Sequence, residues 1–176
     1  LQNGYVSRMP KISKSMVLPK ISVIMPVYNA EVYISQAIES ILNQSYKKFE
    51  LIIVNDASSD KSLDIINGYK SKDKRIKIIN LDNNQGIAIA LNNGVAIAQG
   101  EYIARMDADD ISLPFRLDKQ LKFMESNRAC GVCGSWVETI DKNGNSSDVW
   151  KSPLTHESIK SELLFNSVLY HPTIMF

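Results

Sequence analysis

Two aspartates, Asp107 and Asp109, are separated by one residue and follow directly after a short apolar segment, residues 102–106. Side chains two positions apart in extended backbone project to the same side, so these carboxylates face one way. Carboxylate oxygens bind hard divalent cations, and Mg²⁺ typically takes one or two carboxylates together with substrate phosphates. Because α/β sheets bind ligands at the carboxyl ends of their strands, the pair predicts a metal–diphosphate site with Asp109 and Asp107 as metal ligands.

Polar side chains also follow two earlier apolar segments. One segment ends in Tyr28-Asn29 and the next in Asn55-Asp56. In a parallel sheet these ends lie along one edge. We expect Asp56 to accept a hydrogen bond from the imide N–H of a uracil-like base, and the loop 82–86 to lead into a helix whose N-terminus faces the ligand. Each segment alone also fits a turn or a helix cap, but three polar strand ends together favour a site.

Alternating strand and helix patterns position these side chains. Near-continuous apolar runs predict buried parallel strands at residues 21–27, 51–54, 76–79, 102–106 and 131–137. Apolar residues with helical spacing predict helices near residues 34–42, 61–71 and 87–98, and Pro114 predicts the first turn of another. These five alternations predict an α/β fold: a mostly parallel Rossmann-like sheet with helices on both faces, an α/β/α sandwich.

The pattern changes after residue 137. Asn143-Gly144 is a strong hairpin signal, and Thr155 is a suitable N-cap for a following helix. Residues 170–176 predict a last strand. Trp136 and Trp150 either pack in the core, the alternative that we favour, or stack on the flat face of a substrate.

Composition narrows the class of protein. The 176 residues suffice for one domain with a core, and a net charge of +1 gives no support for nucleic-acid binding. Residues 1–19 hold Arg8, Lys11 and Lys14 without an acid, so we expect a basic, solvated arm before a domain at residues 20–176. Cys130 and Cys133 fit two buried thiols in a reducing cytoplasm better than a redox pair or a zinc site.

Two phosphate-binding motifs are absent from the sequence. Neither a Gly-x-Gly-x-x-Gly nor a Walker-type Gly-Lys-Ser/Thr follows the first strand, so a bound diphosphate would need a cation for neutralisation. A nucleotidyltransferase is an alternative, although it requires a glycine-rich basic loop that residues 26–31 do not supply. A non-catalytic module that only binds a nucleotide ligand is a second alternative. A response regulator-like domain would need a phospho-acceptor Asp and a late Lys in particular places, and no such set is evident.

Several segments together resemble the family-two glycosyltransferases with the GT-A fold. The resemblance extends over residues 20–140, in the order and spacing of the family. It rests on ISVIMPVYN (21–29), LIIVNDASSD (51–60), the segment from Asn84-x-Gly86 to 94, GEYIARMDADD (100–110) and Leu113-Pro114-x-Arg116-Leu117.

The resemblance implies an inverting transferase that uses a nucleotide-diphosphate sugar, most often UDP-linked, with Mn²⁺ or Mg²⁺. It places Asp56 on the base, Asp107 near the ribose and metal, and Asp109 as the principal metal ligand. The implied acceptor is a glycan or a lipid-linked acceptor in cell-surface polysaccharide or lipopolysaccharide synthesis, in the cytoplasm or at the inner face of the cytoplasmic membrane. The expected substrate-binding residues are Pro26, Val27, Tyr28, Asn29, Asp56, Asn84, Gly86, Arg105, Asp107, Ala108 and Asp109.

The resemblance also implies that the general base is an Asp or Glu downstream of a His-Pro strand like residues 171–176. We therefore expect the base beyond Phe176 and a domain that is incomplete at its C-terminus. His171 is a further candidate for the site. On this reading the fragment binds the donor but transfers sugar poorly or not at all.

Overall fold

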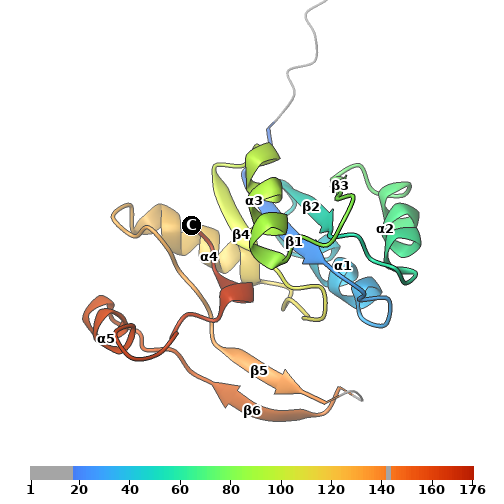
Figure 1. Ribbon diagram of the computed structural model, residues 1–176. Helices are drawn as coiled ribbons and strands as arrows, with labels where there is room; N and C mark the ends of the chain where they lie inside the picture. Colours follow the sequence, from blue (N-terminus) through green and yellow to red (C-terminus); the bar gives the residue numbers. More distant parts are fainter. Residues whose placement is uncertain (1–17, 142–143) are drawn as a thin grey trace, which may run out of the picture.

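The computed structural model describes residues 18–141 and 144–176. Its centre is a parallel four-stranded sheet with the order β3-β2-β1-β4 (Figure 1). The strands are β1 (Ile21–Val27), β2 (Phe49–Asn55), β3 (Ile76–Asn80) and β4 (Tyr102–Arg105). Val27 pairs with Asn55 at the ends of β1 and β2, so the segments that follow these strands start side by side.

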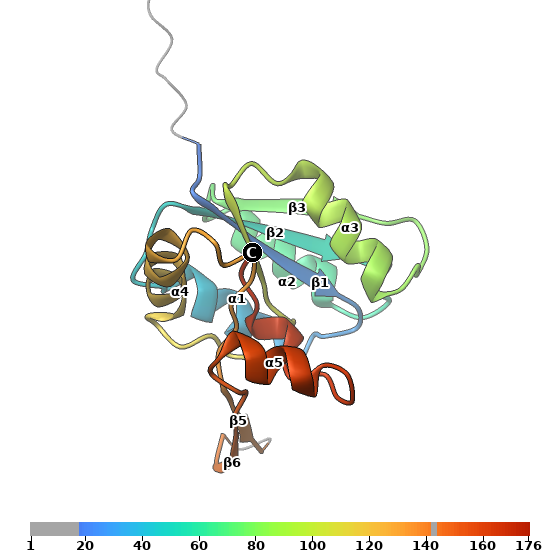
Figure 2. The same cartoon turned by 90° about the vertical axis from the view of Figure 1, so that its left-hand side faces the viewer.

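Helices cover both faces of the sheet, which confirms the predicted α/β/α arrangement. One face packs against α1 (Ile34–Leu42), α2 (Ser62–Lys70) and α4 (Arg116–Ser126). The other face packs against α3 (Ile87–Ile97), which lies across β1 and β2 (Figure 2). The strand and helix positions expected from the sequence through residue 126 therefore hold, within a few residues at the ends.

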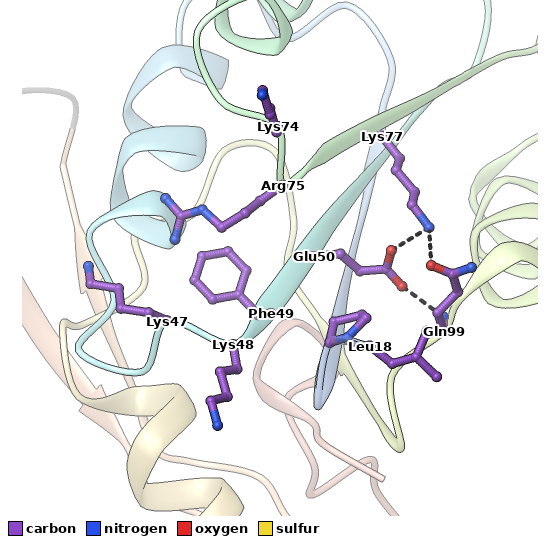
Figure 3. Close-up of a pocket in the computed structure, with 10 residues that line it drawn as sticks. Leu18, Lys47, Lys48, Phe49, Glu50, Lys74, Arg75, Lys77 and Gln99 are labelled. Carbon is purple, nitrogen blue, oxygen red and sulfur yellow. Dashed lines mark hydrogen bonds and ion pairs between the residues drawn. The ribbon is translucent and has the colours of Figure 1, made fainter. Parts of the chain in front are cut away.

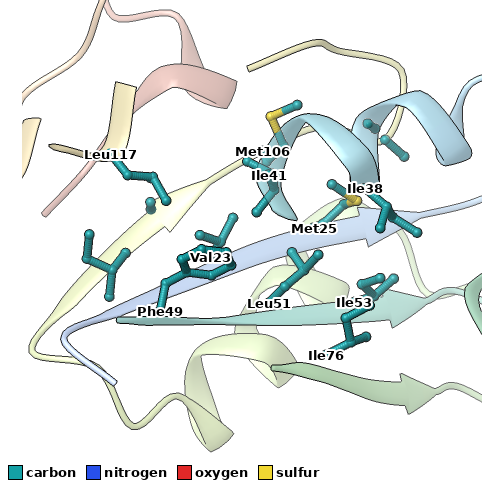
Figure 4. Packing of buried hydrophobic residues seen from close by; sticks show 14 of the residues in the cluster. Val23, Met25, Ile38, Ile41, Phe49, Leu51, Ile53, Ile76, Met106 and Leu117 are labelled. Carbon is teal, nitrogen blue, oxygen red and sulfur yellow. The ribbon is translucent and has the colours of Figure 1, made fainter. Parts of the chain in front are cut away.

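Alternation along the strands divides the core into two layers. Val23 and Met25 of β1 pack with Ile38 of α1, together with neighbours from β2, β3 and α4 (Figure 4). Ile24 points to the opposite face, where a Cβ on Gly94 of α3 would lie 2.5 Å from its Cγ2 atom. Successive residues of a strand face opposite sides, so a strand buried on both faces is apolar throughout, as β1 is.

The segment that carries β5, β6 and α5 extends away from the sheet in both views (Figures 1 and 2). An antiparallel hairpin of β5 (Val137–Ile140) and β6 (Ser146–Trp150) confirms the hairpin prediction, with Asn143 outside the described residues. Thr155 Oγ1 accepts a hydrogen bond from Ser158 N at 3.2 Å and so caps α5 (His156–Glu162), as expected.

Two predicted strands are wrong. Residues 131–136 form a loop with one backbone bridge, Cys133 to Met175. The ladder does not continue, because Ser135 N donates to the side chain of Thr173, at Oγ1, instead of to a backbone oxygen. In place of a strand at residues 170–176, a 3₁₀ turn occupies His171–Thr173, where the ring of Pro172 fixes φ and removes a donor. Only the last three residues run antiparallel to β4, with hydrogen bonds between Ile103 and Phe176.

The expected burial of the cysteines and tryptophans is also corrected. Cys130 and Cys133 are free and only partly buried. Trp136 and Trp150 are 45% and 52% exposed, because both belong to the projecting hairpin region rather than to the core. Residues 1–17 of the expected basic arm lie outside the described residues. Among the helices of residues 18–141 and 144–176, none has the length and apolar composition needed to cross a bilayer.

Candidate functional site

A cavity of about 540 Å³ opens at the carboxyl ends of β1, β2 and β4. It brings together nine of the eleven residues expected to bind substrate, from four separate segments of the chain, and adds two apolar residues of α3. Asn29, Arg105 and His171 do not line it. The lining residues are Pro26, Val27, Tyr28, Asp56, Asn84, Gly86, Ile87, Ala90, Asp107, Ala108 and Asp109.

Asn29 shapes the wall of the site instead of lining it. Its φ is +50°, a conformation that asparagine tolerates better than most residues. The Asn29 Oδ1 atom accepts a hydrogen bond from Ser59 N at 2.8 Å, and Asn29 N donates to Ser58 Oγ at 3.1 Å. The loops after β1 and β2 are therefore joined side chain to backbone, which fixes the position of neighbouring Tyr28.

Asp56 has a structural role that the sequence did not reveal. Its side chain is buried, and its two carboxylate oxygens accept hydrogen bonds from Gln85 N and Gly86 N, each at 2.8 Å. Gly86 has a φ of +86° and precedes α3, a backbone conformation that favours glycine. Asp56 thus holds the loop that carries Asn84 against the cavity, and each oxygen keeps capacity for a further donor.

The two expected metal ligands differ in their surroundings. Asp107 forms an ion pair with Arg105, with 3.0 Å between Oδ1 and Nη2. The exposed Asp109 side chain makes no hydrogen bond or ion pair with the residues that the structure describes. Asp109 is therefore available to a cation, whereas Asp107 is already partly neutralised.

Asp110 and Arg116 complete a charged group around the Asp-x-Asp turn. Burial, reinforced by the negative charges of Asp107 and Asp109, raises the pKa of Asp110 to about 6. Burial lowers the pKa of Arg116 to about 10, a value that leaves the guanidinium charged at neutral pH. Two arginines thus offset part of the repulsion among three neighbouring acids.

The set of donor atoms fits a divalent cation that is coordinated by protein carboxylates and a substrate phosphate together. Within residues 18–141 and 144–176, no group of three or more His, Cys, Asp or Glu side chains could hold a metal ion without other ligands. Two carboxylates, Asp107 and Asp109, line the same cavity. This number suits Mg²⁺ or Mn²⁺, because such ions take few protein ligands and complete their coordination with substrate phosphates and water.

His171 lies apart from this arrangement. It is exposed at the start of the 3₁₀ turn and contributes nothing to the cavity wall. Its expected place in the site therefore gains no support from the geometry.

A second cavity, of about 300 Å³, lies at the opposite, amino-terminal edge of the sheet (Figure 3). It contains none of the expected site residues. Buried Glu50 dominates it, because its carboxylate accepts from Ser22 Oγ at 2.6 Å and pairs with Lys77 Nζ at 2.6 Å. Gln99 N also donates to Glu50, at 2.7 Å, so the group joins β1, β2, β3 and the segment after α3.

The parallel sheet and the acidic cavity at its carboxyl edge define a Rossmann-like α/β protein of the GT-A type. The family model described as "Glycosyl transferase family 2" matches residues 22–176, and the chain belongs to that family. An "Uncharacterized glycosyltransferase MJ1057" of Methanocaldococcus jannaschii is 44% identical over 160 residues, 89% of this chain and 55% of that protein.

Other relatives carry names from polysaccharide synthesis. The "O-antigen biosynthesis glycosyltransferase WbnJ" of Escherichia coli is 39% identical over 91% of this chain and 62% of its own length. The chain spans about half the length of the first curated relatives that it matches. It is therefore a family-two glycosyltransferase domain similar to proteins named for cell-surface glycan synthesis.

Solved structures support the same fold. Staphylococcus aureus TarS in complex with UDP-GlcNAc superposes with a TM-score of 0.70 at 27% identity, covering 89% of this chain and 45% of that one. The mannosyltransferase PcManGT of Pyrobaculum calidifontis, in complex with GDP-Man and Mn²⁺, has a TM-score of 0.65 at 20% identity. It covers 92% of this chain and 45% of that one, and at this identity shows the shared fold alone.

Proposed function

We propose that this chain is the donor-binding part of an inverting glycosyltransferase that takes a UDP-sugar with Mn²⁺ or Mg²⁺. The acceptor would be a glycan or lipid-linked glycan in cell-surface polysaccharide synthesis, in the cytoplasm or at the inner membrane face. One observation carries the proposal: the cavity unites Tyr28, Asp56 and the two acids Asp107 and Asp109, which lie far apart in the sequence. The UDP-GlcNAc complex of similar TarS supports the choice of nucleotide.

Residues from different elements that line the cavity would bind the nucleotide. Asp56 lies at the end of β2, where its carboxylate accepts a hydrogen bond from the N–H of the base. The exposed ring of Tyr28, at the end of β1, covers the base or the ribose from one side. The apolar side chain of Ile87 at the start of α3 also lines the cavity.

Asp107 and Asp109 would hold the cation together with the diphosphate. A bound divalent cation stabilises the negative charge that grows on the leaving phosphate oxygen. The acceptor hydroxyl oxygen forms a bond to the anomeric carbon as the bond from that carbon to the diphosphate breaks, with inversion. The hydroxyl proton passes to a general base, which we place outside residues 1–176.

The test is a calorimetric titration of UDP into the protein with Mn²⁺, repeated with EDTA and with Asp109→Asn. Asp82→Asn, the same change in an exposed loop residue, is the matched control. We expect Mn²⁺-dependent binding that Asp109→Asn weakens at least about tenfold, because a neutral amide is a poor ligand for a hard cation. Equal binding by wild type and Asp109→Asn overturns the assignment of the metal site, and preferential binding of GDP or dTDP overturns the choice of UDP.

A module that binds the donor without transferring sugar is a second candidate. The acids that line the cavity among the described residues, Asp56, Asp107 and Asp109, are all assigned to the base or the cation, which leaves none there to act as general base. Incubation of the 176-residue chain with radiolabelled UDP-sugars and candidate acceptors decides between the two. Sugar transfer excludes the second candidate, whereas tight UDP binding with neither transfer nor hydrolysis supports it.

A further inference from the structure

We propose that Arg116 is a positioning residue. Its side chain joins the start of α4 to the start of the Asp-x-Asp loop and so sets the spacing of the metal-binding carboxylates. The proposal rests on the proposed function and extends it to a residue outside the cavity wall. Arg116 is the first residue of α4, eleven positions after Arg105 at the end of β4. The chain between them carries Asp107, Asp109 and Asp110.

The guanidinium group of Arg116 reaches back to the start of this loop. Its Nη2 atom donates to the backbone oxygen of Arg105 at 2.6 Å, and Nη1 lies 3.6 Å from Met106 Sδ. The third nitrogen, Nε, donates to Gln120 Oε1 one turn along α4, at 3.1 Å. One side chain therefore joins the last residue of β4, the next residue and the first turns of α4.

Gln120 carries the connection on to the chain around the 3₁₀ turn. It is buried, and its Nε2 atom donates to the backbone oxygen of Thr173 at 2.6 Å. The next residue, Ile174, accepts a hydrogen bond from Arg105 N at 3.0 Å. The N–H and C=O of Arg105 are thus both fixed, one by residue 174 and the other by Arg116.

The far side of the loop is anchored separately on α1. Ser112 N donates to Ser40 Oγ at 3.0 Å, and Ser45 N donates to the backbone oxygen of Pro114 at 2.8 Å. Asp109 is left at the apex between two anchored ends. Its position relative to Asp107 then depends on how firmly both ends are held.

The type of residue matters because three contacts leave from one planar group. Arginine presents its donors in a rigid fork, whereas lysine offers one compact ammonium on a flexible stem. Arg116→Lys therefore keeps the charge near Asp110 but cannot hold Arg105, Met106 and Gln120 together. This substitution separates a positioning role from simple charge compensation.

The experiment compares wild type, Arg116→Lys, Gln120→Leu and the double variant, with Lys122→Gln on the exposed side of α4 as the control. Mn²⁺ alone is titrated first, with free Mn²⁺ followed by electron paramagnetic resonance. UDP is then titrated with Mn²⁺ and with EDTA. We expect Arg116→Lys to lose about tenfold in Mn²⁺ affinity and in Mn²⁺-dependent UDP affinity, the size of one lost charged hydrogen bond. UDP affinity in EDTA should stay unchanged.

Non-additivity tests whether the two side chains form one connection. If they do, the double variant loses no more Mn²⁺ affinity than Arg116→Lys alone. Wild-type affinity for Mn²⁺ in Arg116→Lys overturns the proposal. An equal loss of UDP affinity with Mn²⁺ and with EDTA, together with a fall in melting temperature, also overturns the proposal. That pattern would show that the substitution destabilises the whole fold.

Hydrogen exchange separates this proposal from the proposed function. Amides of residues 106–111 should exchange faster in Arg116→Lys than in wild type, while those of β2 and β3 stay unchanged. If wild type binds neither Mn²⁺ nor UDP, the proposed function fails, and with it the positioning of metal ligands. The hydrogen-exchange rates of amides 106–111 then still decide whether Arg116 holds the loop in place.

Discussion

The carboxylate of Asp56 accepts a 2.8 Å hydrogen bond from the backbone N–H of Gly86, which joins the end of β2 to the start of α3 in the cavity wall. The second oxygen accepts from Gln85 N at the same distance. One buried acid thereby sets the position of a loop thirty residues further along the chain. The loop that carries Asn84 and Gly86 belongs to the cavity wall because of this contact.

Asp56→Asn should lower the stability of the protein and its affinity for the nucleotide. An amide nitrogen cannot accept, so one of the two backbone N–H groups loses its partner, at a cost of about 1–3 kcal/mol in the free energy of unfolding. We expect a lower midpoint in urea and weaker UDP binding in calorimetry. Asp82→Asn, in the same loop and exposed, is the control and should change neither quantity. An unaltered urea midpoint in Asp56→Asn would contradict the structural role.

Gly100→Ala should destabilise the protein strongly. A Cβ at residue 100 would lie 2.5 Å from Ser22 N and 2.7 Å from Ile21 C, and backbone atoms of a central strand cannot move aside. Overpacking of this kind costs about 1–3 kcal/mol or more, measurable by urea denaturation.

Gly68→Ala provides the matched control for Gly100→Ala. Gly68 lies within α2 and a Cβ there meets no atom within 4 Å. The same substitution should therefore stabilise the protein by about 0.5–1 kcal/mol, through helix propensity. Similar effects of the two substitutions on unfolding would refute the explanation from close approach.

Gln44→Leu should loosen the junction between α1 and α4. Gln44 is fully buried; its Oε1 atom accepts from Leu117 N at 3.0 Å and its Nε2 atom donates to the Leu113 carbonyl oxygen at 2.7 Å. Leucine preserves much of the volume but leaves Leu117 N without its partner, at a cost of about 1–3 kcal/mol. The Leu113 carbonyl oxygen loses one of two donors and keeps Arg116 N, at 3.0 Å. Chemical denaturation measures the loss. Gln36→Leu on the exposed side of α1 should be close to neutral, and equal losses in both variants would rule out this account.

The Glu50 network makes stability depend on pH. Burial alone raises the pKa of Glu50, but Lys77, the Ser22 hydroxyl and Gln99 N together lower it below its usual value. A depressed folded-state pKa stabilises the native protein above the unfolded value, about 4.3, and this stabilisation disappears as the pH falls through the folded value.

Glu50→Gln tests this dependence by urea denaturation between pH 7 and pH 3. The variant should be less stable than wild type at pH 7, by about 1–3 kcal/mol, and the difference should narrow below pH 4. Glu157→Gln, on exposed α5, should follow wild type throughout. A difference in the free energy of unfolding between wild type and Glu50→Gln that stays constant with pH would show that the Glu50 charge contributes nothing to stability.

The sequence by itself determined the parallel sheet, the helices on both faces and the edge of the sheet at which the candidate site lies. These features follow from local patterns: apolar runs such as 21–27 have a single stable placement, buried between two layers of helices. The same reasoning located Asp107 and Asp109, because residues that end parallel strands must share an edge. The sequence failed at residues 131–137 and 170–176, where apolar composition indicated strands. A loop with one backbone bridge occupies the first segment up to residue 136, and a 3₁₀ turn at His171–Thr173 leaves only the last three residues beside β4 in the second.

Only the tertiary structure decided which polar groups meet. Asp56 with Gly86, Gln44 with Leu117, and Arg116 with Arg105 are pairs that no local pattern indicates. Hydrogen bonds of this kind depend on distance and angle between segments brought together by folding, whereas strand and helix preferences depend on neighbours along the chain. The residue types therefore predicted which side chains gather at the edge of the sheet. They did not predict the hydrogen bonds that hold those side chains in place.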